Sequence, residues 1–172
     1  MSARIESIKN ILLAEDDPRD VELTLAALKE HALANRVTVV GDGEKALDYL
    51  YQRGEFKSRM DGNPILVMLD LKMPKVNGLE VLRIIKADAF LRIIPVVVLS
   101  SSREAPDLAE CYKHGVNAYV VKPLDFEEFM IAIKQLGIFW AAVNEVPLPV
   151  MKQEADPESQ LPSQQTLSLY QS

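Results

Sequence analysis

Five short apolar runs alternate with five stretches of helical periodicity, and this alternation limits the possible folds more than any other feature of the chain. The runs cover residues 8–14, 37–40, 65–69, 94–99 and 118–121. Short apolar runs bounded by polar and turn-forming residues are typical of buried strands. Strands that alternate with helices indicate an α/β protein, in which helices cover both faces of a parallel sheet.

The helical patterns fill the intervals between these runs. Val21, Leu25 and Leu28 mark one face of the first helix, and the other patterns cover residues 43–53, 78–87, 105–114 and 125–143. Residues 53–64 have the Gly, Asp, Asn and Pro content of a surface loop. We therefore predict one domain over residues 1–146. A mostly disordered tail, rich in Pro, Gln and Ser, is predicted over residues 147–172.

Composition narrows the possible partners. The formal net charge is -6 and the pI is near 5.0, whereas a protein that binds a nucleic-acid backbone presents a basic face. No apolar run approaches the roughly 20 residues of a membrane span, and the N-terminus lacks the apolar core of a signal peptide. Cys111 is the sole cysteine, which excludes a disulfide framework and a cysteine-based zinc site. We expect a cytoplasmic protein without nucleic-acid or membrane partners.

Polar residues follow four of the predicted strands at the point where each strand ends. Glu15, Asp16 and Asp17 follow the first run, and Asp70 follows the third. The fourth run is followed by Ser100, Ser101 and Ser102, and the fifth by Lys122 and Pro123. In an open parallel sheet, ligands bind at the carboxyl ends of the strands. Taken singly, a serine run or a Lys-Pro pair indicates a loop or turn, but their placement at one sheet edge predicts a functional site.

The acids at this edge indicate which chemistry the site can perform. Crowded carboxylates repel one another unless a cation joins them, and Mg²⁺ prefers hard oxygen ligands. Glu15, Asp16 and Asp70 fit that role, while Asp17 is explained as the N-cap of a helix that begins at Pro18. Phosphoryl transfer requires mainly positioning and charge neutralisation, which a metal, a lysine and a hydroxyl can supply. Asp70 would be the nucleophile, forming an acyl phosphate.

The motifs "LLAEDDP", "VMLDLKMPKVNG", "PVVVLSS" and "AYVVKP" occur in this order, and the chain resembles the receiver domain of two-component response regulators over about residues 8 to 140. The resemblance implies a flavodoxin-like, doubly wound, five-stranded parallel sheet of order 2-1-3-4-5 with five helices. It also implies Asp70 as the phosphoacceptor. Glu15 and Asp16 would be metal-binding acids, with the backbone carbonyl of Lys72 completing the protein ligands to Mg²⁺.

The same resemblance assigns a switch. Ser100 corresponds to the switch hydroxyl, Lys122 to the phosphate-pairing lysine, and Tyr119 to the aromatic residue that rotates in the fifth strand. The peptide bond between Lys122 and Pro123 is expected to be cis.

A narrower likeness is found in the segments "DYLYQRGEF", "LDLKMPKVNGLEVL" and "IFWAAVNEVPLP", which resemble the single-domain regulators that serve phytochrome histidine kinases. This implies a sensor histidine kinase of the phytochrome class as the phosphoryl donor. The chain itself would be a signalling module and not an enzyme.

Two other classes share these features. A small aspartyl-phosphate phosphatase is disfavoured because Lys72 stands where many such enzymes carry a second acid. A flavin-binding module of the same topology is disfavoured because "EDDPRD" would repel a phosphate in the absence of a metal.

The last helical pattern carries more apolar residues than one core requires. Phe126, Phe129, Met130, Ile133 and Leu136 form one face at helical spacing, and Ile138, Phe139, Trp140 and Val143 follow. We expect a two-fold homodimer through the fifth helix and the C-terminal extension, with Trp140 as its anchor. The alternative is that Trp140 folds back over the edge of the core.

Overall fold

The computed structural model describes residues 10–30, 33 and 36–145. Within these residues, five parallel strands form one sheet of order β2-β1-β3-β4-β5. The strands are β1 (Ile11–Ala14), β2 (Val37–Val40), β3 (Leu66–Asp70), β4 (Val96–Ser100) and β5 (Ala118–Val121). The order expected from the receiver resemblance is confirmed. The predicted tail lies outside the described residues.

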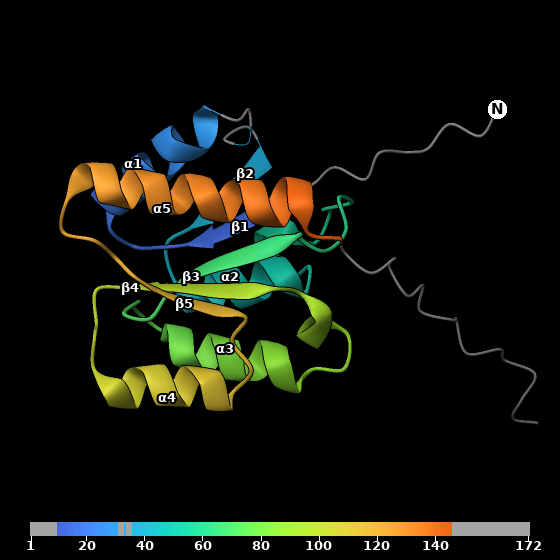
Figure 1. Ribbon diagram of the computed structural model, residues 1–172. Helices are drawn as coiled ribbons and strands as arrows, with labels where there is room; N and C mark the ends of the chain where they lie inside the picture. The colour runs from blue at the N-terminus through green and yellow to red at the C-terminus, as the bar shows by residue number, and fades with distance from the viewer. Residues whose placement is uncertain (1–9, 31–32, 34–35, 146–172) are drawn as a thin grey trace, which may run out of the picture.

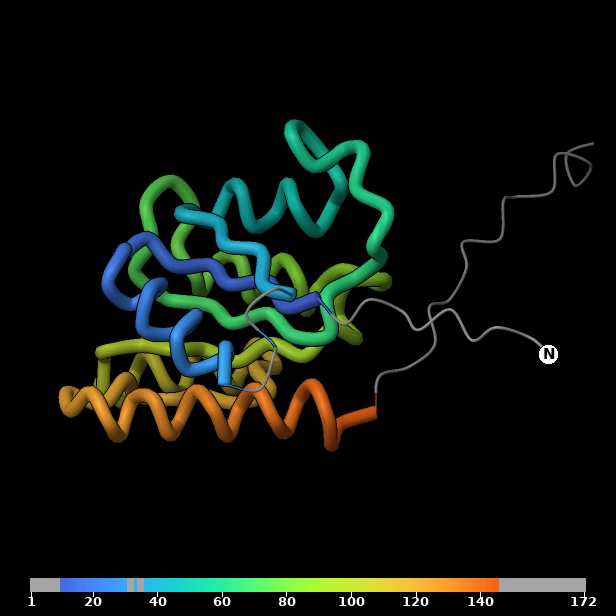
Figure 2. Tube along the Cα trace, turned by 90° about the horizontal axis from the view of Figure 1, so that it is seen from above, coloured from blue at the N-terminus to red at the C-terminus, as the bar shows by residue number. Residues whose placement is uncertain are grey.

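Five α-helices alternate with the strands in the described residues, as expected, and the fifth follows the last strand. They are α1 (Pro18–Lys29), α2 (Gly43–Leu50), α3 (Gly78–Ala87), α4 (Ala105–Lys113) and α5 (Phe126–Ile138). Short helical segments also occur at η2 (Gly54–Phe56), η3 (Leu91–Ile93) and η4 (Phe139–Val143). Figures 1 and 2 show α1 and α5 on one face of the sheet and α2, α3 and α4 on the other. No helix in the described residues is both long enough and apolar enough to cross a membrane.

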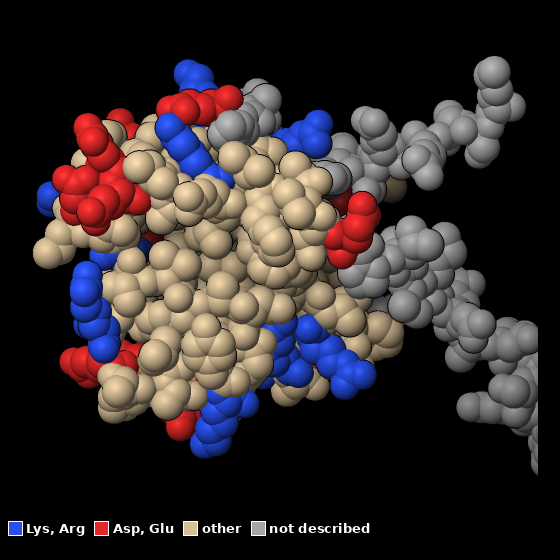
Figure 3. All heavy atoms as spheres, viewed as in Figure 1, with Lys and Arg blue, Asp and Glu red and all other residues tan. Residues whose placement is uncertain are grey.

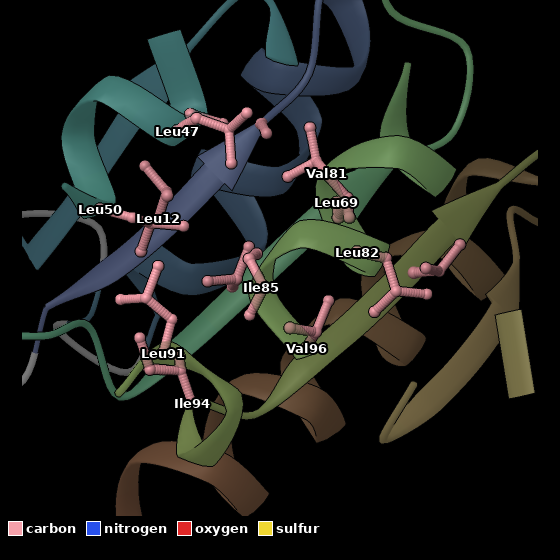
Figure 4. Close-up of a cluster of buried hydrophobic side chains, with 14 of the residues drawn as sticks. Leu12, Leu47, Leu50, Leu69, Val81, Leu82, Ile85, Leu91, Ile94 and Val96 are labelled. Atoms are coloured by element: carbon pink, nitrogen blue, oxygen red, sulfur yellow. The ribbon is translucent and has the colours of Figure 1, made fainter. Parts of the chain in front are cut away.

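The sheet separates two apolar clusters, because successive side chains of a strand point to opposite faces. On the side of α2 and α3, Leu12, Leu69 and Val96 pack with Val81 and Ile85 (Figure 4). On the side of α1 and α5, Leu13 and Met68 pack with Leu28 and Ile133. Burial on both faces explains why each central strand reads as a continuous apolar run.

The end of α5 decides between the two readings of Trp140. The indole packs against the apolar cluster on the α1 and α5 side and makes an edge-to-face contact with Phe139, with ring centroids 5.0 Å apart. The residues left exposed are its neighbours Ile138, Phe139 and Val143. Phe126, expected on the core face, is also exposed. The expectation of an exposed Trp140 is therefore wrong, because the indole is half-buried against this cluster, as in the alternative in which it covers the edge of the core.

Candidate functional site

The carboxyl edge of the sheet brings together the polar residues that follow its strands. Asp70 ends β3 and is in register with Leu99 of β4, and Ser100 ends β4 in register with Val121 of β5. Glu15 directly follows β1, and its amide donates to the carbonyl of Val40, 3.0 Å away. Parallel pairing thus places residues from distant parts of the chain side by side at one edge.

Glu15, Asp16 and Asp70 form a compact group of carboxylates. One ligand oxygen from each lies within 4.8 Å of the others. Glu15 and Asp70 are buried, whereas Asp16 is exposed. Hard carboxylate oxygens at this spacing fit a divalent cation such as Mg²⁺, which binds one or two carboxylates and retains several waters. The donor set at this edge therefore fits the metal expected from the sequence.

Lys122 lies directly over these acids. Its Nζ donates to Glu15 Oε2 at 2.6 Å and to Asp20 Oδ2 at 2.7 Å, and lies 3.3 Å from Asp70 Oδ1. The Lys122 amide donates to the carbonyl of Ser100, 2.8 Å away, so the backbone is tied to β4. The lysine forms the ion pairs of Glu15 and Asp70 in the part of the chain that the structure describes, and it would neutralise part of the repulsion between them.

Burial sets the protonation behaviour of the group. Desolvation raises the pKa of Glu15 and of Asp70, and the ammonium of Lys122 opposes both shifts. Burial by itself would lower the pKa of Lys122, but hydrogen bonds to Asp20 and Glu15 outweigh it and the pKa lies above its usual value. The lysine therefore stays charged, and the acids form a site that favours an additional cation.

The loop from β3 to α3 shapes one wall of the site. The Lys72 amide donates to Asp70 Oδ2 at 3.1 Å, while the Lys72 side chain is exposed. Lys75 has a left-handed φ of 64°, and its Nζ lies 3.1 Å from Asp42 Oδ2 and 3.2 Å from Glu44 Oε2, at the start of α2. These contacts position the loop. The role of the Lys72 carbonyl as a metal ligand stays a prediction.

The predicted switch residues belong to one hydrogen-bonded chain. The Ser102 amide donates to Ser100 Oγ at 3.1 Å, and the Tyr119 hydroxyl donates to the Ser102 carbonyl at 3.0 Å. The Ser102 hydroxyl donates to Asp107 Oδ2 at 2.6 Å and accepts from the Glu104 amide at 3.3 Å. Ser100 and Tyr119 are therefore linked through the loop after β4, and buried Ser102 is the connection between them.

Two local expectations have different outcomes. Asp17 caps α1, since its side chain accepts from the Arg19 amide at 2.8 Å and Pro18 follows. The expected cis peptide before Pro123 is wrong, because no peptide bond in the described residues is cis. The trans form is intrinsically lower in energy before proline by about 0.5 to 1 kcal/mol, and here it is compatible with the hydrogen bond from the Lys122 amide to Ser100.

Asp20 and Ser102 are the members of this site that the sequence did not assign. Asp20 stands in the first turn of α1, five residues after Glu15, where an acid is also a common helix-terminus residue. Ser102 is one of three serines in a row, and nothing local shows that Ser100 and Ser102 are buried while Ser101 is exposed. The segment "EDDPRD" places several acids near the sheet edge. The sequence does not show which of these acids reaches Lys122.

Residues 11–134 match the family described as the response regulator receiver domain, and the chain belongs to this family. It is 39% identical over 140 residues to the probable methanogenesis regulatory protein FilR2 of Methanothrix harundinacea, covering 81% of this chain and 88% of FilR2. It is also 33% identical over 147 residues to response regulator Rcp1 of Synechocystis, covering 86% of this chain and 99% of Rcp1.

Solved structures of response regulators share this fold, among them the phytochrome response regulators RtBRR and RcpA. The bacteriophytochrome response regulator RtBRR is 57% identical, with a TM-score of 0.65 over 84% of this chain and 87% of its own. The phosphorylated cyanobacterial regulator RcpA is 37% identical, with a TM-score of 0.76 over 81% of this chain and 99% of its own. The Mn²⁺-bound form of Rcp1 is 34% identical, with the same TM-score and coverage.

Proposed function

We propose that this chain is a single-domain response regulator that accepts a phosphoryl group on Asp70 and signals through the resulting change of its surface. The observation that carries the proposal is the position of Asp70. It ends the central strand within 4.8 Å of Glu15 and Asp16, and its Oδ1 lies 3.3 Å from Lys122 Nζ. The similarity to a regulator crystallised in its phosphorylated form supports the same reading.

The proposed reaction is a phosphoryl transfer from a phosphohistidine. A carboxylate oxygen of Asp70 attacks the phosphorus, the P–N bond breaks, and the electron pair returns to the imidazole, which is then reprotonated. The product is an acyl phosphate. Lys122 neutralises charge on the phosphoryl oxygens, and the Lys72 amide holds the carboxylate in position. Such transfer needs positioning and charge stabilisation more than covalent chemistry from the protein.

We assign Mg²⁺ as the cofactor held by Glu15, Asp16 and Asp70. Its chemistry would be to neutralise phosphoryl charge and orient the acceptor. Support comes from the three convergent carboxylates and from the Mn²⁺-bound form of Rcp1. The ligand atoms are all hard oxygens, which suits Mg²⁺ and Mn²⁺ alike.

The phosphoryl donor we propose is a sensor histidine kinase of the phytochrome class, since RtBRR and RcpA are both phytochrome response regulators by name. We assign no turnover chemistry to the chain itself, because the residue two positions after Asp70 is Lys72, whose exposed side chain is no second acid. Phosphotransfer from a phytochrome-class kinase should be faster than from unrelated histidine kinases at equal concentration. Equal rates would contradict this assignment of the donor.

Labelling tests the phosphoacceptor. With a small phosphodonor and Mg²⁺, the wild-type protein should form an acid-stable, base-labile adduct, and Asp70→Asn should not. Asp17→Asn is the matched control, because Asp17 lies in the same acidic edge but caps α1, a role that asparagine also fills. Labelling of Asp70→Asn at the wild-type level would refute the proposal.

The signal would travel through the switch residues. A phosphoryl group on Asp70 would attract the Ser100 hydroxyl, which now accepts from the Ser102 amide, and so shift the loop that Tyr119 holds. Ser100→Ala should still accept phosphate but lose the linked change on α4, β5 and α5. Equal chemical-shift responses on that face in wild type and Ser100→Ala would exclude this route.

The output surface would be a homodimer interface at α5 and η4. Phe139 and Val143 remain 48% and 63% exposed there, and Figure 3 shows that the face formed by α5, β5 and α4 carries few charged side chains. Sedimentation should show a reversible dimer that Phe139→Ser weakens. Met60→Ser, at a residue that is 96% exposed in the loop between η2 and β3, is the control. A wild type that stays monomeric with and without phosphorylation would refute the interface.

A further inference from the structure

Asp20 binds the key lysine of the site without belonging to the carboxylate group. Its Oδ2 lies 2.7 Å from Lys122 Nζ, closer than the 3.3 Å that separates Nζ from Asp70 Oδ1. The lysine side chain is 11% exposed and the Asp20 side chain 30%. The contact is therefore a largely sheltered ion pair, in which a charge-assisted hydrogen bond is stronger than one on an open surface.

The donors of Lys122 are divided between two kinds of carboxylate. An ammonium has three N–H groups, and hydrogen bonds from Nζ go to Glu15 and to Asp20. Glu15 also belongs to the group whose oxygens lie within 4.8 Å of one another, whereas Asp20 does not. Of the carboxylates that contact Lys122 within the described residues, Asp20 is the one that stands outside the candidate metal site.

This division matters when the site takes a cation. A divalent cation and the Lys122 ammonium would compete for the same carboxylate oxygens of Glu15 and Asp70. The two positive groups would also repel each other. The Lys122 backbone is tied to Ser100, so the side chain starts from a fixed point at this edge and its partners decide where the ammonium lies. A partner beside the site would keep the ammonium close to Asp70 while freeing the ligand oxygens.

We propose that Asp20 is a positioning residue that holds the Lys122 ammonium while Glu15 and Asp70 coordinate a divalent cation. The proposal rests on the proposed function, because it concerns the same site. Without the Asp20 charge, Lys122 has Glu15 and Asp70 as its remaining charged partners and competes with the cation for them. Asp20 thereby raises the affinity for metal through the lysine, in addition to any direct attraction.

Mg²⁺ titration of the full chain by calorimetry tests this inference in two backgrounds. Asp20→Asn keeps the shape of the side chain and removes its charge, and it should weaken Mg²⁺ binding about tenfold, as expected for closely coupled charges. Lys122→Met should bind Mg²⁺ more tightly than wild type. In the Lys122→Met background, Asp20→Asn should change the affinity by less than about threefold, because the coupling partner is gone. Asp20→Glu should restore part of the loss.

A metal-free measurement separates the ion pair from the metal site. Urea unfolding in EDTA of wild type, Asp20→Asn, Lys122→Met and the double variant should give a nonadditive change of about fivefold or more in the unfolding equilibrium constant. An unchanged Mg²⁺ affinity in Asp20→Asn, or the same fold-change in both backgrounds, would overturn the role of Asp20. A wild type that binds no Mg²⁺ would instead refute the metal site, and additive metal-free effects would refute the ion pair itself.

Discussion

Gly78, the first residue of α3, is expected to be intolerant of a side chain as small as a methyl group. A Cβ atom added there would lie 2.0 Å from the Asp70 carbonyl oxygen and 2.8 Å from Leu71 Cα. Both are backbone atoms at the end of the central strand, so no side-chain rotation relieves the overlap. The Gly78 amide also donates to the Leu71 carbonyl at 2.9 Å, which holds the two segments together.

The magnitude of the effect follows from this geometry. Gly78→Ala requires the start of α3 to move from β3 by more than about 1 Å, and strain of this kind costs about 1 to 3 kcal/mol, with a rigid backbone neighbour near the upper end. Helix propensity opposes it, since alanine is favoured over glycine by at most about 1 kcal/mol. The net expectation is a loss of about 2 kcal/mol in the free energy of unfolding, or a Tm lower by about 4 to 8 °C.

Urea unfolding followed by circular dichroism measures this loss, with Gly41→Ala as the matched control. Gly41 precedes α2, is exposed, and has nothing within 4 Å of an added Cβ. The control should be neutral or more stable by about 0.4 to 1 kcal/mol, because alanine restricts the unfolded chain. If Gly78→Ala is as stable as Gly41→Ala, the close approach of α3 to the Asp70 backbone does not exclude a side chain at residue 78, and the steric argument is refuted.

Two further predictions concern the half-buried Lys86 and the buried Asp70. Lys86 Nζ donates to the carbonyls of Arg92 and Ile94 and to Asn117 Oδ1 at 2.8 to 3.1 Å. Lys86→Met should therefore lower the free energy of unfolding by about 2 kcal/mol, because these acceptors lose their donor. Equal urea midpoints for Lys86→Met and wild type would contradict this. Burial raises the pKa of Asp70 above 3.8, so in EDTA the folded state binds a proton more readily than the unfolded state. The resulting stability is present below pH 3.8 and is lost as the pH rises through the folded pKa. Asp70→Asn should lack this part of the pH dependence, and parallel curves for the two proteins would be inconsistent with a buried Asp70.

Much of the site could be predicted from the sequence because its parts are encoded locally. The apolar run from Leu66 marks β3, and the first acid after it, Asp70, stands at the strand end. Glu15, Ser100 and Lys122 follow their own strands in the same way. Parallel strands share one carboxyl edge, so the pattern predicts that these residues converge without any knowledge of distances.

The tertiary structure decided which side chains form pairs. Asp20 and Lys122 are 102 residues apart, and the acids near Asp20 in the sequence are equally plausible partners for the lysine until α1 packs against α5. The choice between Phe139 and Trp140 is similar, since their rotation about the helix axis depends on how α5 lies against α1. The periods of strands and helices determine on which face of its element a residue lies. Which side chains then form a pair depends on how separate elements pack against each other, and the local sequence pattern does not contain that information.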